Sequence, residues 1–330
     1  MNERRYATEL GPQYTKGRSF RARAEARQRE YRAGVLGVDW SEHGHWLCED
    51  AVAHGANFVV PEAFEAAQKR DNAGKGVGAR TFKNMLSSQA MCFNLFAPLA
   101  NDMPLAARVL RSFLPWLGRV DAIHIEYTPS NEIFGDQTGL GGVDCDVLIE
   151  GTLNDGDGAV IVLETKFVEP EFSVCSFCQP RRIKEGKPYC SGSIPVRTDP
   201  GACLYKSQKH YRYWQRTIEL GTLAENKLPA DKCPFSGPLW QLWVNHVLAH
   251  AEAARRKTPR AVFGVVAPET NDALHRGLRI FEEFIHLLAE QSSFVFIGVD
   301  AFIQSLREVT ESEAHHEAWI EGLQARYTSI

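Results

Sequence analysis

The sequence predicts an α/β fold in which a mixed central β-sheet is flanked by helices. The composition is that of an ordinary globular protein, with 44% hydrophobic and 24% charged residues in a chain of 330. Hydrophobic periodicity between residues 80 and 310 predicts a helix, three strands, a helix and a strand, in that order. Two of these strands are separated by GTLNDGDG, whose two Asp-Gly pairs are typical of a hairpin turn. These observations favour a single sheet with helices packed on it.

Residues 1–79 are predicted to form a basic N-terminal arm followed by a small helical or mixed segment. Residues 1–35 hold nine Arg and Lys against four Glu, a charge of 9 − 4 = +5. Such an arm is either a solvated helix or a contact to nucleic acid. The apolar run Ala56–Pro61 lies in the mixed segment, and the loop Asn72–Gly78 ends the region.

The first core helix is predicted over Thr81–Ala97. Phe82, Leu86, Phe93 and Phe96 recur at helical spacing, and Pro98 follows the helix. Gln89 falls on the same apolar face. A buried amide needs hydrogen-bond partners, so Gln89 has either a structural role or a role in a site.

The remaining elements follow in chain order. Three strands precede a Cys-containing insertion at 170–203, and a helical tail is predicted at 311–330. The predicted strands are Val120–Tyr127, Val143–Glu150, Ala159–Phe167, Ala261–Ala267 and Ser293–Val299. The predicted helices are Leu204–Leu220, one within Gly237–Arg256, Asp272–Ala289 and Ala301–Val309.

Acidic and basic side chains meet at the hairpin. Residues two apart share one face of a strand, so Glu164 and Lys166 project together from the end of an otherwise apolar strand. Charges there are costly unless they are paired or bound to metal. Asp146 on the preceding strand offers a second carboxylate, with Asp144 as its rival on the same face. Mg²⁺ typically takes one or two carboxylates in proteins. The alternative is a structural ion pair at a sheet edge.

This arrangement resembles the PD-(D/E)XK nuclease superfamily, in particular a restriction-endonuclease-like branch. The resemblance covers about 80–310 and implies a restriction-endonuclease-like core with the element order αβββαβ. The phrases that carry it are Ser87-Ser88-Gln89, Cys92-Phe93-Asn94-Leu95-Phe96, Ile125-Glu126-Tyr127, Asp146-Val147-Leu148-Ile149, Leu163-Glu164-Thr165-Lys166-Phe167 and Val265-Val266-Ala267-Pro268 followed by Asn271.

The resemblance implies roles for individual residues. Asp146 and Glu164 match the metal ligands of the family, and Lys166 matches its catalytic lysine. Gln89 matches a polar position of the first core helix where many members carry Glu. Glu126 matches a recurrent acid of the first strand, with metal support or core structure as its two readings. Cys145 stands where the family often has Pro.

Family members often carry a Gln and an aromatic residue on the helix after the Glu-x-Lys strand, near the scissile phosphate. Gln208 and Tyr211 share one face of the predicted helix Leu204–Leu220 and are the candidates for these positions. The alternative is an ordinary amphipathic helix packed on the sheet.

Four cysteines lie close together in the insertion, at Cys175, Cys178, Cys190 and Cys203. Four thiolates suit a tetrahedral structural Zn²⁺, and an iron–sulfur cluster also uses four cysteines. A third reading is that they bind no metal. Residues 166–216 hold ten Lys and Arg against four acids, or +6. The insertion within this stretch carries Arg181, Arg182, Lys184 and Lys187, so it is also suited to contact a phosphate backbone.

The predicted function is therefore a phosphodiesterase that cuts DNA with Mg²⁺ or Mn²⁺, in the manner of restriction or foreign-DNA defence. The alternatives are a protein of nuclease fold that binds nucleic acid without cutting it, and a zinc-stabilised scaffold that binds a partner. The sequence does not separate DNA from RNA, and many enzymes of this fold act as homodimers. No stretch reads as a signal peptide or membrane span, which predicts a cytoplasmic protein.

Overall fold

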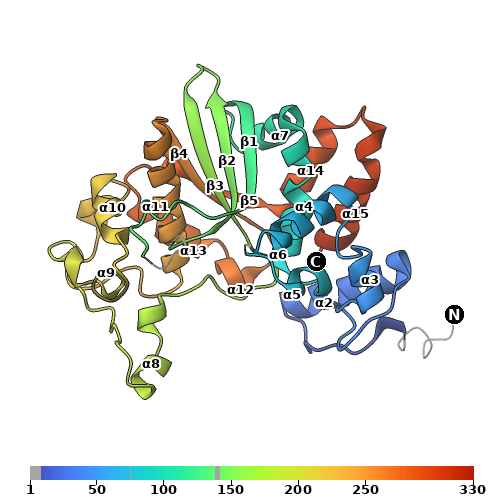
Figure 1. Cartoon of the computed structure of the whole chain (residues 1–330), viewed down its shortest axis with the longest axis horizontal. Coiled ribbons are helices and arrows are strands. Elements are labelled where there is room, and N and C mark those ends of the chain that lie inside the picture. The colour runs from blue at the N-terminus through green and yellow to red at the C-terminus, as the bar shows by residue number, and fades with distance from the viewer. Residues whose placement is uncertain (1–8, 75, 138–141) are drawn as a thin grey trace.

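The computed structural model describes residues 9–74, 76–137 and 142–330 and contains a five-stranded sheet. Arg4 and Arg5 of the predicted arm lie outside the described residues. The strands are β1 (Leu117–Tyr127), β2 (Cys145–Leu153), β3 (Gly158–Thr165), β4 (Arg260–Ala267) and β5 (Phe294–Gly298), in spatial order β1-β2-β3-β4-β5. β1, β2 and β3 run antiparallel, whereas β3, β4 and β5 run parallel (Figure 1). The predicted mixed sheet is confirmed.

The central strands are apolar on both faces because helices cover both faces of the sheet. On β3, Val160 and Val162 belong to one hydrophobic core, and Ile161 and Leu163 to the other. The period of two residues thus divides a continuous apolar run between two layers. Thr152 pairs with Gly158 at the end of the β2–β3 ladder, as the predicted hairpin requires.

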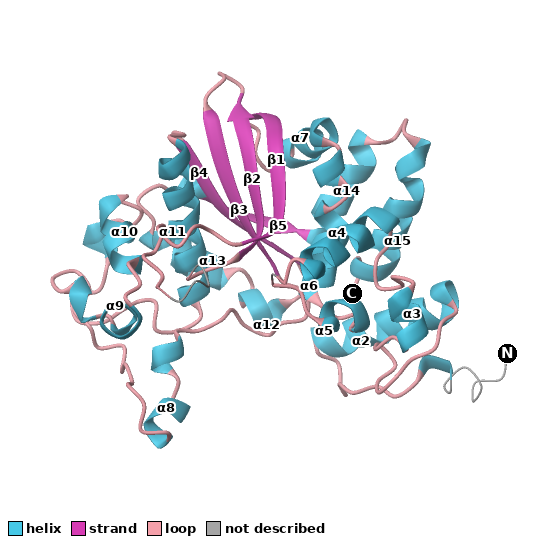
Figure 2. Cartoon of the chain, viewed as in Figure 1, coloured by secondary structure: helices cyan, strands magenta, loops and turns pink. Residues whose placement is uncertain are grey.

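The first layer contains α10 (Tyr213–Glu219), α11 (Leu239–Arg256) and α13 (Arg279–Leu287), and α11 packs against both β3 and β4. The second layer contains α6 (Ser88–Phe96), α7 (Met103–Arg111), α14 (Val299–Val309) and α15 (Glu317–Tyr327). Figure 2 shows the sheet standing between these two groups of helices. None of the helices in the described ranges combines the length and apolar character needed to cross a bilayer.

The N-terminal region packs on the second layer. It contains α2 (Phe20–Tyr31), a π-helical turn (Arg32–Leu36), α3 (Glu49–Ala53) and α4 (Pro61–Asn72). Two of its basic side chains serve the fold, because Arg29 donates to the Leu10 carbonyl and buried Arg32 donates to the Gly44 carbonyl. The charge predicted for nucleic-acid contact is therefore partly used inside the protein.

The helix predicted over Thr81–Ala97 is two helices, α5 (Ala79–Lys83) and α6. The chain is extended at Asn84, and the Asn84 side chain accepts the backbone N–H of Leu86. Ser87 then caps α6 by accepting the N–H of Ala90 at 3.3 Å. Local capping thus overrides the helical spacing of the phenylalanines.

Two further predicted helices are also interrupted. Leu204–Leu220 is α9 (Leu204–Lys209) and α10, separated at His210, whose φ of +61° is left-handed. Asp272–Ala289 is α12 (Asp272–His275) and α13, separated by Arg276, Gly277 and Leu278, all with positive φ. Such a backbone cannot continue a right-handed helix. The insertion contains one more short helix, α8 (Arg181–Lys184).

Candidate active site

Glu164 lies at the end of β3 and is held on both carboxylate oxygens. Only 4% of its surface is exposed. The Gln241 amide donates to Oε1 at 2.6 Å, and the Asn245 amide donates to Oε2 at 2.7 Å. Gln241 and Asn245 are four residues apart on α11, so they face Glu164 together. These contacts fix the carboxylate at the C-terminal end of β3, where α11 packs on the sheet.

Lys166 extends the same strand and faces the same carboxylate. Its Nζ lies 2.7 Å from Glu164 Oε1, and its backbone N–H donates to the Val266 carbonyl at 2.9 Å. Burial alone would lower the pKa of Lys166, but the charges of Glu164 and Asp146 outweigh burial and raise this pKa above its ordinary value. The ammonium form of Lys166 is therefore stabilised here.

Asp146 lies beside this pair at the start of β2. The β2–β3 ladder ends at Val147 and Leu163. The Asp146 carboxylate occupies the next position, where its Oδ2 accepts both the N–H and the hydroxyl of Thr165 at 2.6 Å. The rival Asp144 is exposed and interacts instead with Thr128 and Arg70. The structure thus brings Asp146, rather than Asp144, against the end of β3.

Glu126 supplies a third carboxylate from the end of β1. Its φ is +55°, an uncommon value for a residue other than glycine, and its backbone carbonyl accepts Arg70 Nη2. Gln89 from the start of α6 hydrogen-bonds the Glu126 side chain. Gln89 also donates to the Gly76 carbonyl at 2.9 Å. Gln89 and Glu126 therefore lie together where β1 ends.

The three carboxylates repel one another. Burial raises the pKa of Glu126 to about 7, and the charge of Glu164 contributes to this rise. Burial, followed by the charges of Glu164 and Glu126, raises the pKa of Asp146 well above its usual range. Glu126 Oε1 is buried and has no hydrogen-bond partner among the described residues. A hard divalent cation suits these donors, because it would relieve the repulsion and satisfy the unpartnered oxygen. The three carboxylates do not place one oxygen each within 4.8 Å of one another in the described part of the chain, so binding such an ion requires them to move closer together.

A cavity of about 330 Å³ opens beside Gln89. Its lining includes Ser87, Ser88 and Glu169 together with Arg21 and Arg80. Ser88 donates to Glu169, which also accepts the N–H of Phe167 just after Lys166. The cavity thus places two arginines, which suit phosphate groups, near the segment that follows the Glu-x-Lys strand, but Asp146, Glu164 and Lys166 do not line it.

The structure does not bring Gln208 and Tyr211 to Glu164. Gln208 is exposed on the short α9, and Tyr211 packs in an aromatic cluster with Tyr205 and Tyr213. α11 packs on β3, and its Gln241 and Asn245 are the side chains that hydrogen-bond Glu164. The signal in the sequence was a Gln and an Asn four residues apart within the apolar stretch Leu239–Leu248.

The four predicted thiols lie in the connection between β3 and α11. The Cys178 side chain is within hydrogen-bonding range of both Cys175 and Cys190, and Cys203 is close enough for its charge to interact with theirs. Cys233, which spacing alone did not include, lies close to Cys175, Cys190 and Cys203.

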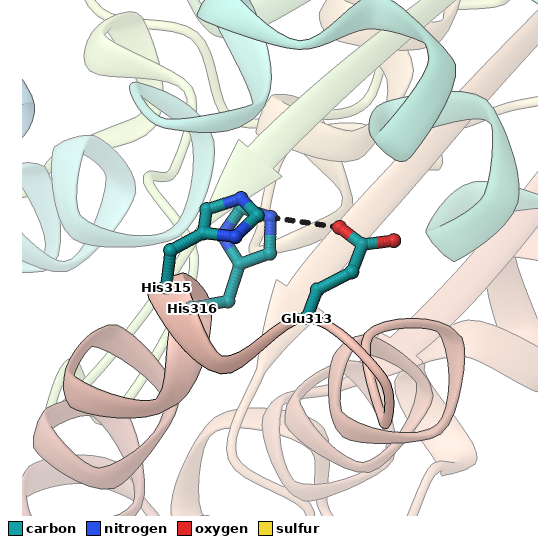
Figure 3. A group of neighbouring side chains, drawn as sticks. All are labelled: Glu313, His315 and His316. Atoms are coloured by element: carbon teal, nitrogen blue, oxygen red, sulfur yellow. Dashed lines mark ion pairs between the residues drawn. The ribbon is translucent and has the colours of Figure 1, made fainter.

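A different group gathers ligand atoms in the turn between α14 and α15. Glu313, His315 and His316 place theirs within 4.8 Å of one another, the one such group of three found in the described ranges (Figure 3). His316 Nε2 lies 3.2 Å from Glu313 Oε2, while Arg108 Nη2 takes the other oxygen at 2.7 Å. Because Arg108 already neutralises Glu313, we assign no metal to this group.

Comparison with known proteins agrees with this geometry. A family model described as the PD-(D/E)XK nuclease superfamily matches residues 15–182 and 205–329, which include Asp146, Glu164 and Lys166. The match omits 183–204, the segment that carries Cys190 and Cys203. No curated protein and no solved structure matches the chain. With the mixed sheet, the Glu-x-Lys strand and a family match over most of its length, the chain belongs to the PD-(D/E)XK nuclease superfamily.

Proposed function

We propose that this protein is a divalent-metal-dependent endonuclease that hydrolyses phosphodiester bonds in DNA, in the manner of restriction or foreign-DNA defence. The observation that carries the proposal is the convergence of three carboxylates and an ammonium group at one edge of the sheet. The cluster suits a metal site, because a bound divalent cation would relieve the repulsion between buried carboxylates that Lys166 offsets only in part.

Asp146 and Glu164 are the proposed ligands of Mg²⁺ or Mn²⁺, and Glu126 supports them. The bound ion would lower the pKa of a water molecule and polarise the phosphate. The amides of Gln241 and Asn245 keep the Glu164 carboxylate in one orientation. Such supporting hydrogen bonds set ligand geometry and reactivity in metal sites.

Lys166 supplies the positive charge that the reaction needs. A phosphodiester gains negative charge on its oxygens as water attacks, and an ammonium group stabilises that charge or orients the water. Lys166 is fixed for this role by its 2.7 Å contact with Glu164. Arg21 and Arg80, which line the adjoining cavity, are the proposed contacts to the phosphate backbone.

Cleavage assays test the proposal. Supercoiled plasmid, linear duplex, single-stranded DNA and RNA are incubated with the protein and Mg²⁺, Mn²⁺ or EDTA. We expect metal-dependent cleavage of DNA, lost by roughly a thousandfold in Glu164→Gln and Lys166→Met, because each removes several kcal/mol of transition-state stabilisation. The matched controls are Glu171→Gln and Lys232→Met, both at exposed positions.

Two results would contradict the proposal. If folded wild-type protein binds DNA yet cuts no nucleic acid with either metal, the non-cleaving alternative holds. If Glu164→Gln, folded by circular dichroism, cuts as fast as Glu171→Gln, the observed cleavage comes from another site or a contaminant. Cleavage of RNA but not of DNA would support metal-dependent hydrolysis of phosphodiesters and would show that DNA is not the substrate.

A further inference from the structure

Five thiols gather in the connection between β3 and α11. Cys175 and Cys190 are buried, and the other three are half-buried against the same hydrophobic core. All are free cysteines, so no disulfide joins them. The five are Cys175, Cys178, Cys190, Cys203 and Cys233.

Backbone hydrogen bonds bring the loops that carry them together. The Cys190 N–H donates to the Phe177 carbonyl at 2.8 Å, which places Cys190 against the Cys175–Cys178 turn. The Cys233 N–H donates to the Gly192 carbonyl at 2.7 Å. Cys178 lies between the side chains of Cys175 and Cys190 and hydrogen-bonds both. Thiols from separate turns therefore meet in one place.

Backbone N–H groups point at the sulfurs with one recurring pattern. The Gly192 N–H donates to Cys190 Sγ at 3.3 Å, from two residues further along the chain. The N–H groups of Phe177, Tyr205 and Phe235 stand in the same relation to Cys175, Cys203 and Cys233. A neutral thiol is a weak acceptor, so donors aimed at these four sulfurs suit thiolates, the form that binds metal.

The connection also has little regular structure to stabilise it. Its longest helices are α10 with seven residues and α9 with six, and α8 has four. The family model matches the chain on both sides of 183–204 but does not match that segment. A metal cross-link is a common means of stabilising a segment of this kind.

We propose that Cys175, Cys178, Cys190 and Cys203 bind one structural zinc ion. Four sulfur donors in a largely buried position form a closed tetrahedral set, which favours Zn²⁺ over the hard cations suited to carboxylates. No three of these sulfurs lie within 4.8 Å of one another in the described part of the chain, so zinc binding requires the turns to move closer together. The inference is independent of the proposed nuclease activity.

Cys203 is chosen over Cys233 as the fourth ligand. Two backbone N–H groups, from Tyr205 and Lys206, approach the Cys203 sulfur, as two approach that of Cys175. A single N–H, from Phe235, approaches the Cys233 sulfur. Cys233 then lies beside the zinc site without binding the ion.

Metal analysis of the purified full-length chain, grown with zinc and kept reduced, tests the site. We expect about one zinc per chain in the wild type and a loss of at least about tenfold in Cys175→Ser, Cys178→Ser, Cys190→Ser or Cys203→Ser. Cys48→Ser and Cys233→Ser should retain the metal, and so should Glu164→Gln, which separates this site from the nuclease centre.

Cobalt substitution in the wild type keeps the test valid if a serine variant fails to fold. Co²⁺ bound by four thiolates should give strong thiolate charge-transfer absorption and intense visible bands. Wild-type protein that holds neither zinc nor Co²⁺ overturns the proposal, and so does iron with acid-labile sulfide. Retention of zinc by Cys203→Ser but not by Cys233→Ser overturns the choice of fourth ligand.

Discussion

At the scale of single residues, Glu164 shows how a carboxylate is prepared for a metal. It is buried, yet both of its oxygens are hydrogen-bonded and Lys166 lies 2.7 Å away. These contacts hold the carboxylate in one orientation, which fixes the geometry of a metal ligand. The amides of α11 are therefore positioning groups, and changing them should affect activity without removing any ligand.

Asn245→Ala should lower cleavage by roughly 10–100-fold, because the metal ligand loses one of its supporting hydrogen bonds. Its signature is a raised Mg²⁺ requirement, measured as the metal concentration at half-maximal rate. Asn154→Ala, at an exposed position of the β2–β3 turn, is the matched control. An unchanged Mg²⁺ requirement in Asn245→Ala would show that this amide only fills space.

Added Mg²⁺ should raise the thermal unfolding midpoint of the wild type, because the ion binds the folded carboxylate cluster and relieves its repulsion. A ligand at about a hundred times its Kd adds about 2.7 kcal/mol to the free energy of unfolding. The rise should be absent in Glu164→Gln and present in Glu171→Gln, as measured by differential scanning fluorimetry. Equal rises in both variants would mean that the ion binds elsewhere.

At the scale of elements, α11 serves both the site and the core. Gln241 and Asn245 face Glu164, whereas His246 lies against Phe284 of α13 and His250 lies against His246. His246 Nε2 lies 2.8 Å from the Ser293 hydroxyl and 3.3 Å from His250 Nε2. Burial lowers the pKa of both histidines, that of His250 to about 4. Both are therefore neutral in the folded protein near pH 7.

Acid should destabilise the fold through these histidines. The unfolded chain takes up protons near pH 6.5, whereas His250 in the folded state does so only near 4. The contribution of neutral His250 to the free energy of unfolding is therefore complete above pH 6.5. It is lost as the pH falls toward 4, and the loss reaches about 3 kcal/mol. Urea unfolding across this range should show a smaller loss for His250→Gln than for the wild type. If the free energy of unfolding falls by the same amount in both proteins over this range, His250 does not cause the loss.

At the scale of the whole molecule, the two ends of the chain are joined. Arg326 of α15 is fully buried, and its Nε donates to the Gln28 side chain on α2 at 3.0 Å. Its Nη2 donates to Asn57 Oδ1 at 2.8 Å, and Gln28 returns a bond to the Arg326 carbonyl at 2.7 Å. The boundaries predicted after residues 79 and 310 stay predictions, but these bonds cross both of them.

Arg326→Met should lower the free energy of unfolding by about 3 kcal/mol, because buried acceptors on three segments lose a charged donor. The expected readout is a lower urea midpoint with an unchanged slope, which would indicate that the chain still unfolds as one unit. Arg279→Met, at an exposed position, is the control. Separate transitions for the N-terminal region and the sheet would show instead that they are independent domains.

Local signals in the sequence were enough to predict the five strands and to select Asp146, Glu164 and Lys166 as candidate site residues. All five strands were predicted near their observed bounds, because period-two alternation and Asp-Gly turns are local signals. Asp146, Glu164 and Lys166 followed from the same alternation, since a shared face depends only on spacing along a strand and on the hairpin that joins two strands.

The helix that supports the site depends on long-range packing. Gln208 is a candidate because Leu204–Leu220 is the first helix predicted after the Glu-x-Lys strand, but sequence order does not determine which helix packs on the sheet. The fold instead places α11 there, and with it Gln241 and Asn245. The interruptions of the three predicted helices at Asn84, His210 and Gly277 also depend on long-range contacts, so the local sequence does not predict them. Capping and packing contacts with distant segments, such as those of Asn57 with the carbonyl groups of Thr81 and Asn84, outweigh the local preference for a continuous helix.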